Sequence, residues 1–268
     1  MSAFLVNDRP TQTIMLRGSN PDALFKYLEE VQKCEADAYG FSISGLCPEF
    51  KNADFFSRLF KALNGKPVYV TNYSRCNTEK QITDEQLKEQ LLCALDCGAT
   101  LIDVPGHMFS DSKEEISYDE RAAEKQRSFI EEIHRRGGEV LMSSHIFRFV
   151  PQDEVMKIAN AHRTRGADIS KIVTMSDNED ETLENLRTTA ELKLRLGIPS
   201  LFLSNGACCA KHRLLSPALG SCMCLCSPDT VPKNFQPHIG AYKTLFETIS
   251  GCSNNILNND TQYCERSL

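Results

Sequence analysis

The sequence has no long hydrophobic run, no basic leader and no excess of positive charge. It contains no stretch of about 18 consecutive apolar residues, which argues against an ordinary membrane-spanning helix. The segment Met1–Pro10 lacks a basic region followed by an apolar core, so we expect no secretory signal. A formal net charge of −6 indicates no basic surface of the kind that binds nucleic acid. These absences predict a cytoplasmic protein without membrane or nucleic-acid partners.

Signatures of a bound cofactor or metal are also missing. No Gly-x-Gly-x-x-Gly follows the first predicted strand, so nothing favours a dinucleotide. The 12 cysteines are interpreted as reduced thiols, because no secretory signal accompanies them. Cys222, Cys224 and Cys226 share one strand face and could converge, although zinc sites more often use Cys-x-x-Cys turns. We expect no cofactor and no metal, and Cys226 is left as a residue that could touch a substrate.

Apolar strand-like stretches alternate with amphipathic helical segments along almost the whole chain. Two helix starts are well marked, by Asn20 before Pro21 and by Thr83 with Gln86 three residues later. We expect strands at 13–17, 36–44, 66–72, 99–104, 139–144, 166–175, 198–204 and 221–226. We expect helices at 20–34, 55–63, 83–97, 119–136, 151–165, 180–196 and 239–249, with a short helix before Gly220.

Eight strands that alternate with helices across short loops are typical of parallel βαβ units. The sequence therefore predicts an α/β fold, a single-domain (β/α)8 TIM barrel over residues 1–250, followed by a polar tail at 251–268. A doubly wound open sheet is the alternative.

The sixth predicted strand, Gly166–Met175, carries one lysine inside an apolar run. Alternation places Ile169, Lys171 and Val173 on one face and Ile172 on the other. Desolvation disfavours the ammonium form and leaves an amine that can attack a carbonyl, so Lys171 is a candidate Schiff-base nucleophile. A lysine that only reaches out to solvent is the alternative.

The strand ends supply further polar candidates, because active sites of such barrels lie at the C-terminal ends of the strands. His145 follows the fifth strand and Lys171 lies on the sixth, so the two side chains should be neighbours. A histidine beside such a lysine suits proton abstraction next to an imine. A loop histidine bonded to a backbone carbonyl is the alternative. The strand ends also collect Ser42, Asn72, Tyr73, Asp103, Ser143, Ser144, Ser204 and Cys226.

Several segments resemble type I 3-dehydroquinate dehydratases. In that family a histidine after strand five and a lysine on strand six form the catalytic pair. The resemblance of Val140–Phe147 and Gly166–Met175 places these roles on His145 and Lys171. The segment Arg213–Ser221 resembles the one with the family's carboxylate-binding arginine, which places that role on Arg213, and a substrate-binding glutamine falls on Gln236. The resemblance spans about residues 12 to 250, including the third strand at 66–71.

Other family positions are replaced in this chain. A strand-two glutamate and arginine fall on Gly40 and Ser42, and an arginine after the third strand falls on Tyr73 or Asn72. We expect Ser42 and Tyr73 to line the substrate site in their stead. The glutamate that orients the histidine falls on Pro105, which leaves only His107 or Asp103 to orient His145. Loss of buried hydrogen-bond partners weakens recognition of a hydroxylated ring, so we expect imine chemistry with weak activity on 3-dehydroquinate.

The resemblance implies a Schiff-base dehydratase, a carbon–oxygen lyase of the shikimate pathway, that acts on a small carboxylate and forms a homodimer. Two alternatives stay open. One is the same lysine chemistry on another keto acid, which the replacements at Gly40 and Pro105 favour. The other is a non-catalytic ligand-binding or regulatory barrel, against which the retention of His145 and Lys171 argues.

Overall fold

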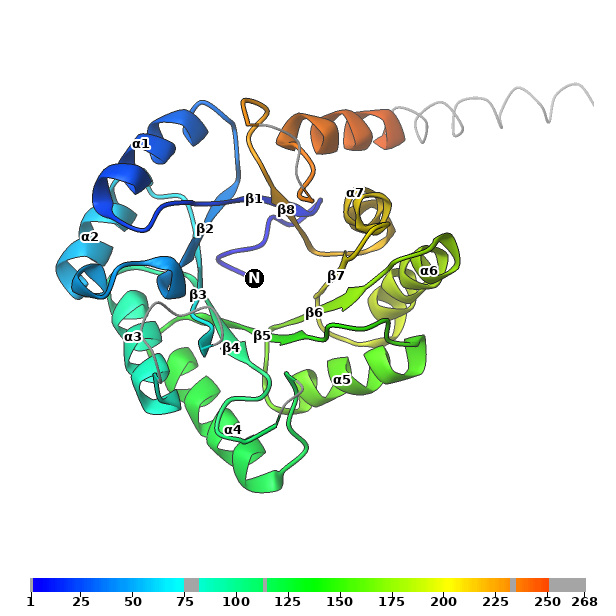
Figure 1. Ribbon diagram of the computed structural model, residues 1–268, viewed down its shortest axis with the longest axis horizontal. Coiled ribbons are helices and arrows are strands. Elements are labelled where there is room, and N and C mark those ends of the chain that lie inside the picture. Colours follow the sequence, from blue (N-terminus) through cyan, green and yellow to red (C-terminus); the bar gives the residue numbers. More distant parts are fainter. Residues whose placement is uncertain (1, 75–81, 113–114, 232–234, 251–268) are drawn as a thin grey trace, which may run out of the picture.

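The computed structural model describes residues 2–74, 82–112, 115–231 and 235–250, and shows strands around a central axis with helices outside them (Figure 1). The strands are β1 (Thr11–Met15), β2 (Ala38–Ser42), β3 (Val68–Thr71), β4 (Leu101–Pro105), β5 (Glu139–His145), β6 (Ile169–Met175), β7 (Ser200–Asn205) and β8 (Met223–Cys226). The helices are α1 (Pro21–Val31), α2 (Ala53–Lys61), α3 (Asp84–Asp96), α4 (Glu120–Arg135), α5 (Gln152–Thr164), α6 (Glu179–Arg195) and α7 (Cys209–Leu219), and residues 239–250 are also helical. The predicted polar tail at 251–268 lies outside the described residues.

The eight strands form one parallel sheet in which neighbours in sequence are neighbours in space, and β1 also pairs with β8. The two ends of this order, β7 and β8, approach each other across a seam. There the backbone N–H of Cys222 donates to the carbonyl of Ser200 at 2.8 Å. The barrel is therefore nearly closed, the prediction of a single-domain (β/α)8 TIM barrel is confirmed, and the open-sheet alternative is wrong.

The register of β6 decides whether its lysine can serve a site inside the barrel. Ile169 and Val173 belong to the inner hydrophobic cluster, whereas Ile172 packs in an outer cluster against the helices. Lys171 lies between the two inner residues and pairs with Ser143 of β5 and Leu201 of β7. Because side chains alternate along a strand, Lys171 points into the barrel, as predicted.

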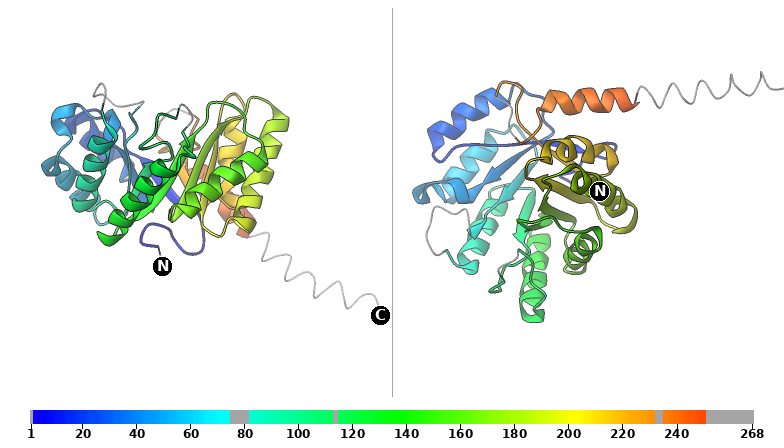
Figure 2. Two further views of the ribbon diagram at one scale, coloured as in Figure 1. Left: turned by 90° about the horizontal axis from the view of Figure 1, so that it is seen from below. Right: turned by 45° about the vertical axis from the view of Figure 1, so that its right-hand side comes forward.

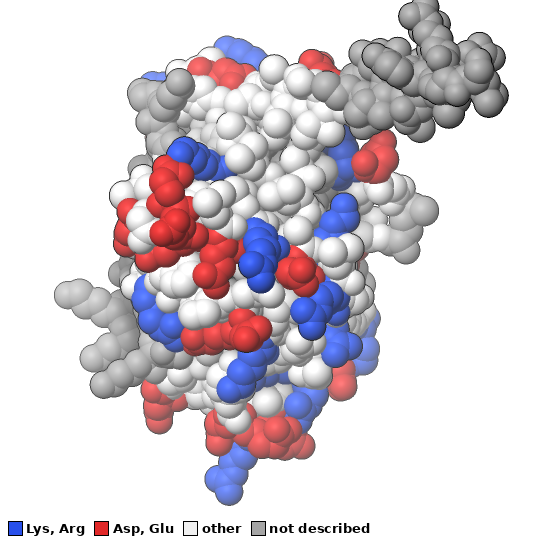
Figure 3. Space-filling view, turned by 90° about the vertical axis from the view of Figure 1, so that its right-hand side faces the viewer, with Lys and Arg blue, Asp and Glu red and all other residues white. Residues whose placement is uncertain are grey.

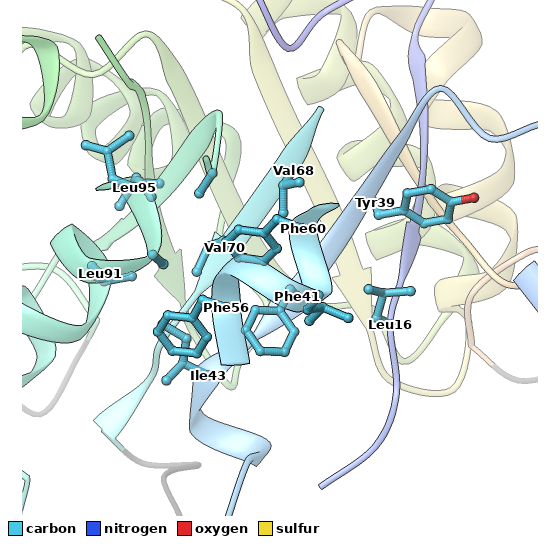
Figure 4. Packing of buried hydrophobic residues seen from close by; sticks show 14 of the residues in the cluster. Leu16, Tyr39, Phe41, Ile43, Phe56, Phe60, Val68, Val70, Leu91 and Leu95 are labelled. Atoms are coloured by element: carbon cyan, nitrogen blue, oxygen red, sulfur yellow. The ribbon is translucent and has the colours of Figure 1, made fainter. Parts of the chain in front are cut away.

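An aromatic cluster between the sheet and its helices holds β2 and β3 in place. The Phe41 ring on β2 meets the rings of Phe56 and Phe60 on α2 edge-on, with centroids 5.8 Å apart in both pairs (Figure 4). Phe56 and Phe41 are almost fully buried. Edge-to-face pairs stabilise a fold beyond the area that they bury. Val68 and Val70 of β3 belong to the same cluster, so this packing holds the two strands that contribute Ser42 and Tyr69 to the site.

The N-terminal segment covers the end of the barrel opposite the strand C-termini (Figure 2). The Phe4 ring is 1% exposed and meets the Tyr69 ring edge-on at 6.3 Å between centroids. The Ser2 hydroxyl donates to the carboxylate of Glu139, the first residue of β5, at 2.6 Å. The N-terminal segment therefore closes this end of the barrel below the inner hydrophobic cluster. No pattern in the sequence predicted this arrangement.

The two helix starts with marked capping signals were predicted correctly, whereas α2 begins at Ala53 and not at residue 55. Thr83 and Gln86 form the predicted capping box, and Asn20 caps the helix that begins at Pro21. The first strand begins at Thr11 and not at residue 13, because Thr11 pairs with Met223 of β8 and its N–H donates to the carbonyl of Cys222, the residue before that strand. Strand pairing thus recruits polar residues that an apolar run does not include.

Two buried histidines brace the outer faces of the sheet. The His162 ring lies between the hydroxyls of Ser144 and Ser170, at 3.0 and 2.9 Å. The His212 ring lies in the same way between hydroxyls, those of Thr189 and Ser204 among them. Burial lowers the pKa of each ring to about 3, so both are neutral in the folded protein at neutral pH.

These rings predict a loss of stability in mild acid. Their pKa is about 3 when folded against 6.5 in a free histidine, so the unfolded state binds their protons first as the pH falls below 6.5. The free energy of unfolding should fall by up to about 1.4 kcal/mol per pH unit for each ring between pH 6.5 and 5. Urea unfolding at pH 7, 6 and 5 measures this slope, and His162→Asn should about halve it. A slope unchanged in His162→Asn would contradict the assignment.

Candidate active site

A cavity of about 310 Å³ opens at the C-terminal ends of the strands. All six residues that the sequence predicted for the site line it, namely Lys171, His145, Arg213, Gln236, Ser42 and Tyr73. Its remaining wall is formed by Met15, Tyr69, Thr71, Val173, Leu203, Asn205, Leu225 and Phe235. Residues from strands on all sides of the barrel therefore converge on one space the size of a small ligand.

Lys171 sits on the floor of this cavity inside a group of oxygen atoms. It is 4% exposed, and its Nζ lies 2.6 Å from the Tyr73 hydroxyl and 3.0 Å from the Tyr69 hydroxyl. Nζ also lies 3.3 Å from Oδ2 of Asp103, a carboxylate that is completely buried on β4. The Ser143 hydroxyl donates to the other oxygen of that carboxylate. The amine therefore has a fixed position and a counter-charge.

The strand that carries Lys171 is largely apolar, but the groups around its amine are polar. Asp103 accepts hydrogen bonds from the hydroxyls of both Tyr69 and Tyr73 on the oxygen nearest Lys171. Burial, and next the Asp103 carboxylate, hold the pKa of each phenol well above its usual value. Both phenols therefore keep their protons and act as hydrogen-bond donors. The sequence places Asp103 at a strand end but does not predict its contact with Lys171.

His145, at the end of β5, is oriented by Glu115. The His145 Nδ1 lies 2.5 Å from Oε2 of Glu115, and the same oxygen accepts the His145 backbone N–H at 2.9 Å. Because Nδ1 is engaged, Nε2 is the ring nitrogen left for proton transfer. The expectation that only His107 or Asp103 could orient this histidine is wrong, because the carboxylate comes from the loop after β4 and not from position 105.

The loop that carries Glu115 is anchored by a side chain of α4 and by one from the residue that follows α5. The Arg165 guanidinium, 5% exposed, donates to the carbonyls of Gly106 and Ser117. Gln126 of α4 donates to the carbonyls of Gly106 and Met108, at 3.1 and 2.7 Å. These bonds hold both ends of the loop, so Glu115 has a defined position next to His145.

Tyr73 connects the lysine group to the histidine pair. Its ring meets the His145 ring edge-on, with centroids 4.9 Å apart and an interplanar angle of 81°. Its hydroxyl is the oxygen nearest to Lys171 Nζ among those of the described residues. A phenol thus lies between the amine and the imidazole, and Lys171 and His145 face one cavity from neighbouring strands.

Arg213 of α7 lines the cavity from another side. Its Nε donates to the carbonyl of Ser204 at 2.6 Å and its Nη2 to the side chain of Asn205 at 2.7 Å, both at the end of β7. The guanidinium also lies over the Phe235 ring, 5.0 Å from its centroid. Burial lowers the pKa of Arg213, yet a guanidinium stays charged at neutral pH. A positive group thus faces a cavity whose other cation is Lys171.

The wall formed by β1 and β2 is less polar than the rest. The Met15 sulfur occupies the space that a side chain at Gly40 would need, 2.0 Å from where its Cβ would lie. The Ser42 hydroxyl is engaged with that of Ser44 at 2.9 Å. Cys226 does not line the cavity, because β8 directs it, like Cys224, into the hydrophobic cluster between the sheet and helices α1 to α4. This side of the site offers a thioether and one hydroxyl.

Fold and site together define a class of protein: a (β/α)8-barrel enzyme with a buried lysine and a carboxylate-bound histidine at its mouth. The family model described as type I 3-dehydroquinase matches residues 13–239. The chain belongs to this family, whose members are carbon–oxygen lyases, and the resemblance seen in the sequence is confirmed.

Individual relatives agree with this assignment. A 3-dehydroquinate dehydratase of Clostridium kluyveri is 26% identical over 225 residues, which are 80% of this chain and 82% of that protein. The solved structure of a type I 3-dehydroquinate dehydratase from Clostridium difficile, with covalently modified comenic acid, aligns with a TM-score of 0.78 and 19% identity over 91% of this chain and 94% of its own. The 3-dehydroquinate dehydratase from Geobacillus kaustophilus aligns with a TM-score of 0.77 and 15% identity, over 92% and 93%. The structural matches support the same barrel.

Within the described ranges, no helix is both long and apolar enough to cross a membrane. Among those same residues, no group of three or more His, Cys, Asp or Glu side chains could hold a metal ion. On the side of the molecule seen in Figure 3, acidic and basic side chains are interspersed and not segregated.

Proposed function

We propose that this chain dehydrates a cyclic keto acid of the 3-dehydroquinate type through an imine on Lys171. The observation that carries the proposal is the placement of Lys171, the Glu115-bound His145 and Arg213 around one cavity. An amine, an acid–base group and an anion-binding group are the three parts that such a reaction needs. The same three parts argue against a barrel that only binds a ligand.

Each residue then has a defined role. The Lys171 amine attacks the ring ketone, and loss of water leaves an iminium that withdraws electrons from the neighbouring carbon. Nε2 of His145 removes the proton from that carbon and returns a proton to the hydroxyl that departs from the next carbon as water. Hydrolysis of the imine frees the product and restores Lys171. Glu115 orients the imidazole and stabilises its protonated form.

The substrate follows from the relatives, which are described as 3-dehydroquinate dehydratases. One of the two reasons for expecting weak activity on 3-dehydroquinate falls away, because Glu115 supplies the carboxylate that Pro105 does not. The second reason, the loss of polar partners for the ring hydroxyls, still holds. Met15 covers Gly40 and leaves few polar groups on the wall formed by β1 and β2. A different keto acid is therefore the alternative substrate for the same chemistry.

Borohydride trapping tests the proposal. The full chain is mixed with 3-dehydroquinate and sodium borohydride, and the adduct is mapped by mass spectrometry. We expect a stable mass on the peptide that contains Lys171 and on no other lysine. Turnover of 3-dehydroquinate without an adduct on Lys171 would refute the imine. If neither turnover of 3-dehydroquinate nor an adduct on Lys171 is observed, another keto acid is favoured as the substrate. A panel of cyclic keto acids would then identify it by the same adduct.

Arg213→Lys should raise KM by about 10- to 100-fold with a smaller change in kcat. A guanidinium presents two parallel donors to a carboxylate and a lysine does not, and a bond of this kind contributes about 1.5–3 kcal/mol. Steady-state kinetics on the trapped substrate measure the change. Lys211→Gln, an exposed site on the same helix, is the control and should leave KM unchanged. An unchanged KM in Arg213→Lys would remove Arg213 from substrate binding.

We also propose, on the family resemblance, a cytoplasmic homodimer that serves the shikimate pathway without a cofactor. Light scattering of the purified chain tests the dimer. Complementation of a host that lacks dehydroquinate dehydratase tests the pathway.

A further inference from the structure

The hydroxyl of Tyr73 lies between the reacting amine and a buried carboxylate. Its oxygen is 2.6 Å from Lys171 Nζ and donates its proton to Oδ2 of Asp103 at 2.5 Å. Lys171 can therefore donate to Tyr73 while Tyr73 donates to Asp103, an unbroken chain of two hydrogen bonds. The proposed function gives the His145–Glu115 pair the proton on carbon and leaves this second chain without a role.

We propose that Tyr73 and Asp103 form a proton relay for imine formation at Lys171, separate from the Glu115–His145 pair that acts on carbon. The proposal rests on the imine chemistry proposed above and adds to it a second acid–base device with its own step. Tyr73 acts on the reacting nitrogen itself, so it is a catalytic residue in this scheme, and Asp103 acts through it.

The ion pair between Lys171 and Asp103 prevents the lysine from acting as a nucleophile, and the proton relay removes this obstacle. An ammonium held 3.3 Å from a carboxylate has no lone pair with which to attack a carbonyl. In the relay, Lys171 passes one proton to the Tyr73 oxygen while Tyr73 passes its own proton to Asp103. The result is a neutral amine beside a protonated Asp103, with the phenol unchanged.

The protons balance over the whole step. The amine forms a bond to the carbonyl carbon, and the carbonyl oxygen takes back the proton stored on Asp103 through Tyr73. A second proton leaves the nitrogen for the same oxygen, the carbon–oxygen bond breaks, and water departs. Of the three protons on the ammonium, two leave in the water and one stays on the iminium. Tyr73 and Asp103 end as they began, and no outside oxidant or reductant is needed.

Geometry favours Tyr73 over Tyr69 for this role. The Tyr69 hydroxyl is farther from Nζ, at 3.0 Å, and its ring lies deeper in the barrel, packed against Phe4 and fully buried. The Tyr73 ring is only partly buried and lies edge-on to His145, beside the space that the substrate would fill. The raised pKa of both phenols keeps them protonated, as donors to Asp103 must be. We assign Tyr69 to holding the carboxylate in place.

The test separates formation of the imine from elimination. The full chain is mixed rapidly with 3-dehydroquinate and, in a second arm, with glyoxylate, a small carbonyl acid that can form an imine but cannot be dehydrated. Borohydride quenching at increasing times gives the rate at which Lys171 becomes trapped. Elimination is followed in the first arm as product formed from the imine already present.

Tyr73→Phe keeps the ring against His145 and removes only the hydroxyl. We expect imine formation to slow by about 100-fold in both arms, while elimination from the formed imine stays near the unsubstituted rate. Tyr69→Phe is the matched control and should slow imine formation much less. The double variant Tyr73→Phe/Asp103→Asn should form the imine nearly as fast as Asp103→Asn alone. Members of one relay act as a unit, so the second substitution removes little more.

The outcomes are distinguishable. Equal losses in Tyr69→Phe and Tyr73→Phe, or equal slowing of imine formation and elimination, would overturn the relay and reduce Tyr73 to a structural role. Unchanged imine formation in Tyr73→Phe would overturn it directly. Slowed trapping with glyoxylate, in a chain that does not dehydrate 3-dehydroquinate, would support the relay and refute the proposed substrate. No trapping at Lys171 in either arm, nor with any member of the panel of cyclic keto acids, would refute both proposals.

Discussion

Replacement of Lys171 by methionine should lower kcat for dehydration by at least about 10⁴-fold and abolish the borohydride adduct. Without the amine no imine forms, and the proton next to the ketone is no longer activated by an iminium. Methionine keeps much of the length of the side chain that packs between Ile169 and Val173 inside the barrel. The measurement is steady-state turnover together with intact-mass analysis after borohydride.

This variant has a structural cost that must be separated from its chemical one. Lys171→Met leaves the Asp103 carboxylate buried with hydroxyl donors from Tyr69, Tyr73 and Ser143 but without its cation. Breaking a buried pair in this way costs about 3–5 kcal/mol. The double variant Lys171→Met/Asp103→Asn removes both charges and should regain part of that stability while staying inactive. Activity in either variant would exclude Lys171 as the nucleophile, whereas Lys211→Met should behave as the unsubstituted chain.

His145→Ala should lower kcat by about 10²–10⁴-fold and yet preserve trapping at Lys171. A positioned general acid–base contributes this much, and the amine keeps its own partners when the imidazole is lost. The imine should therefore form and accumulate, and borohydride should give more adduct per turnover than in the unsubstituted chain. Single-turnover kinetics with timed quenching measure both quantities.

Glu115→Gln probes the same step through orientation. The amide can accept from Nδ1 in one rotamer and donate to it in the other, and the second rotamer would place the proton on Nε2, where the base must be free. We expect a fall in kcat with little change in KM and with trapping intact. Glu154→Gln removes a carboxylate that pairs with Arg148 on the exposed surface and is the matched control. Loss of trapping in Glu115→Gln or His145→Ala would mean that the two acid–base devices are not separate.

The barrel and the direction of its lysine were accessible from local pattern. Strand alternation placed Ile169, Lys171 and Val173 on one face, and helix starts such as the Thr83–Gln86 capping box are encoded within four residues. The active-site end of a parallel barrel is also fixed by topology, because each strand must be followed by a helix that returns the chain. The sequence alone therefore placed Lys171 and His145 on neighbouring strands.

The partners of these two residues were decided only by the tertiary structure. Glu115 precedes His145 by 30 positions in an irregular loop, and its place depends on Arg165 and Gln126, which bind the loop backbone from farther along the chain. Asp103 meets Lys171 across 68 positions. The alternation of side chains along a strand and the capping of a helix depend on residues that are near neighbours in sequence. A short stretch of sequence therefore predicts them. Which polar side chains meet at a barrel mouth depends on strand stagger and loop packing, which the whole chain determines together.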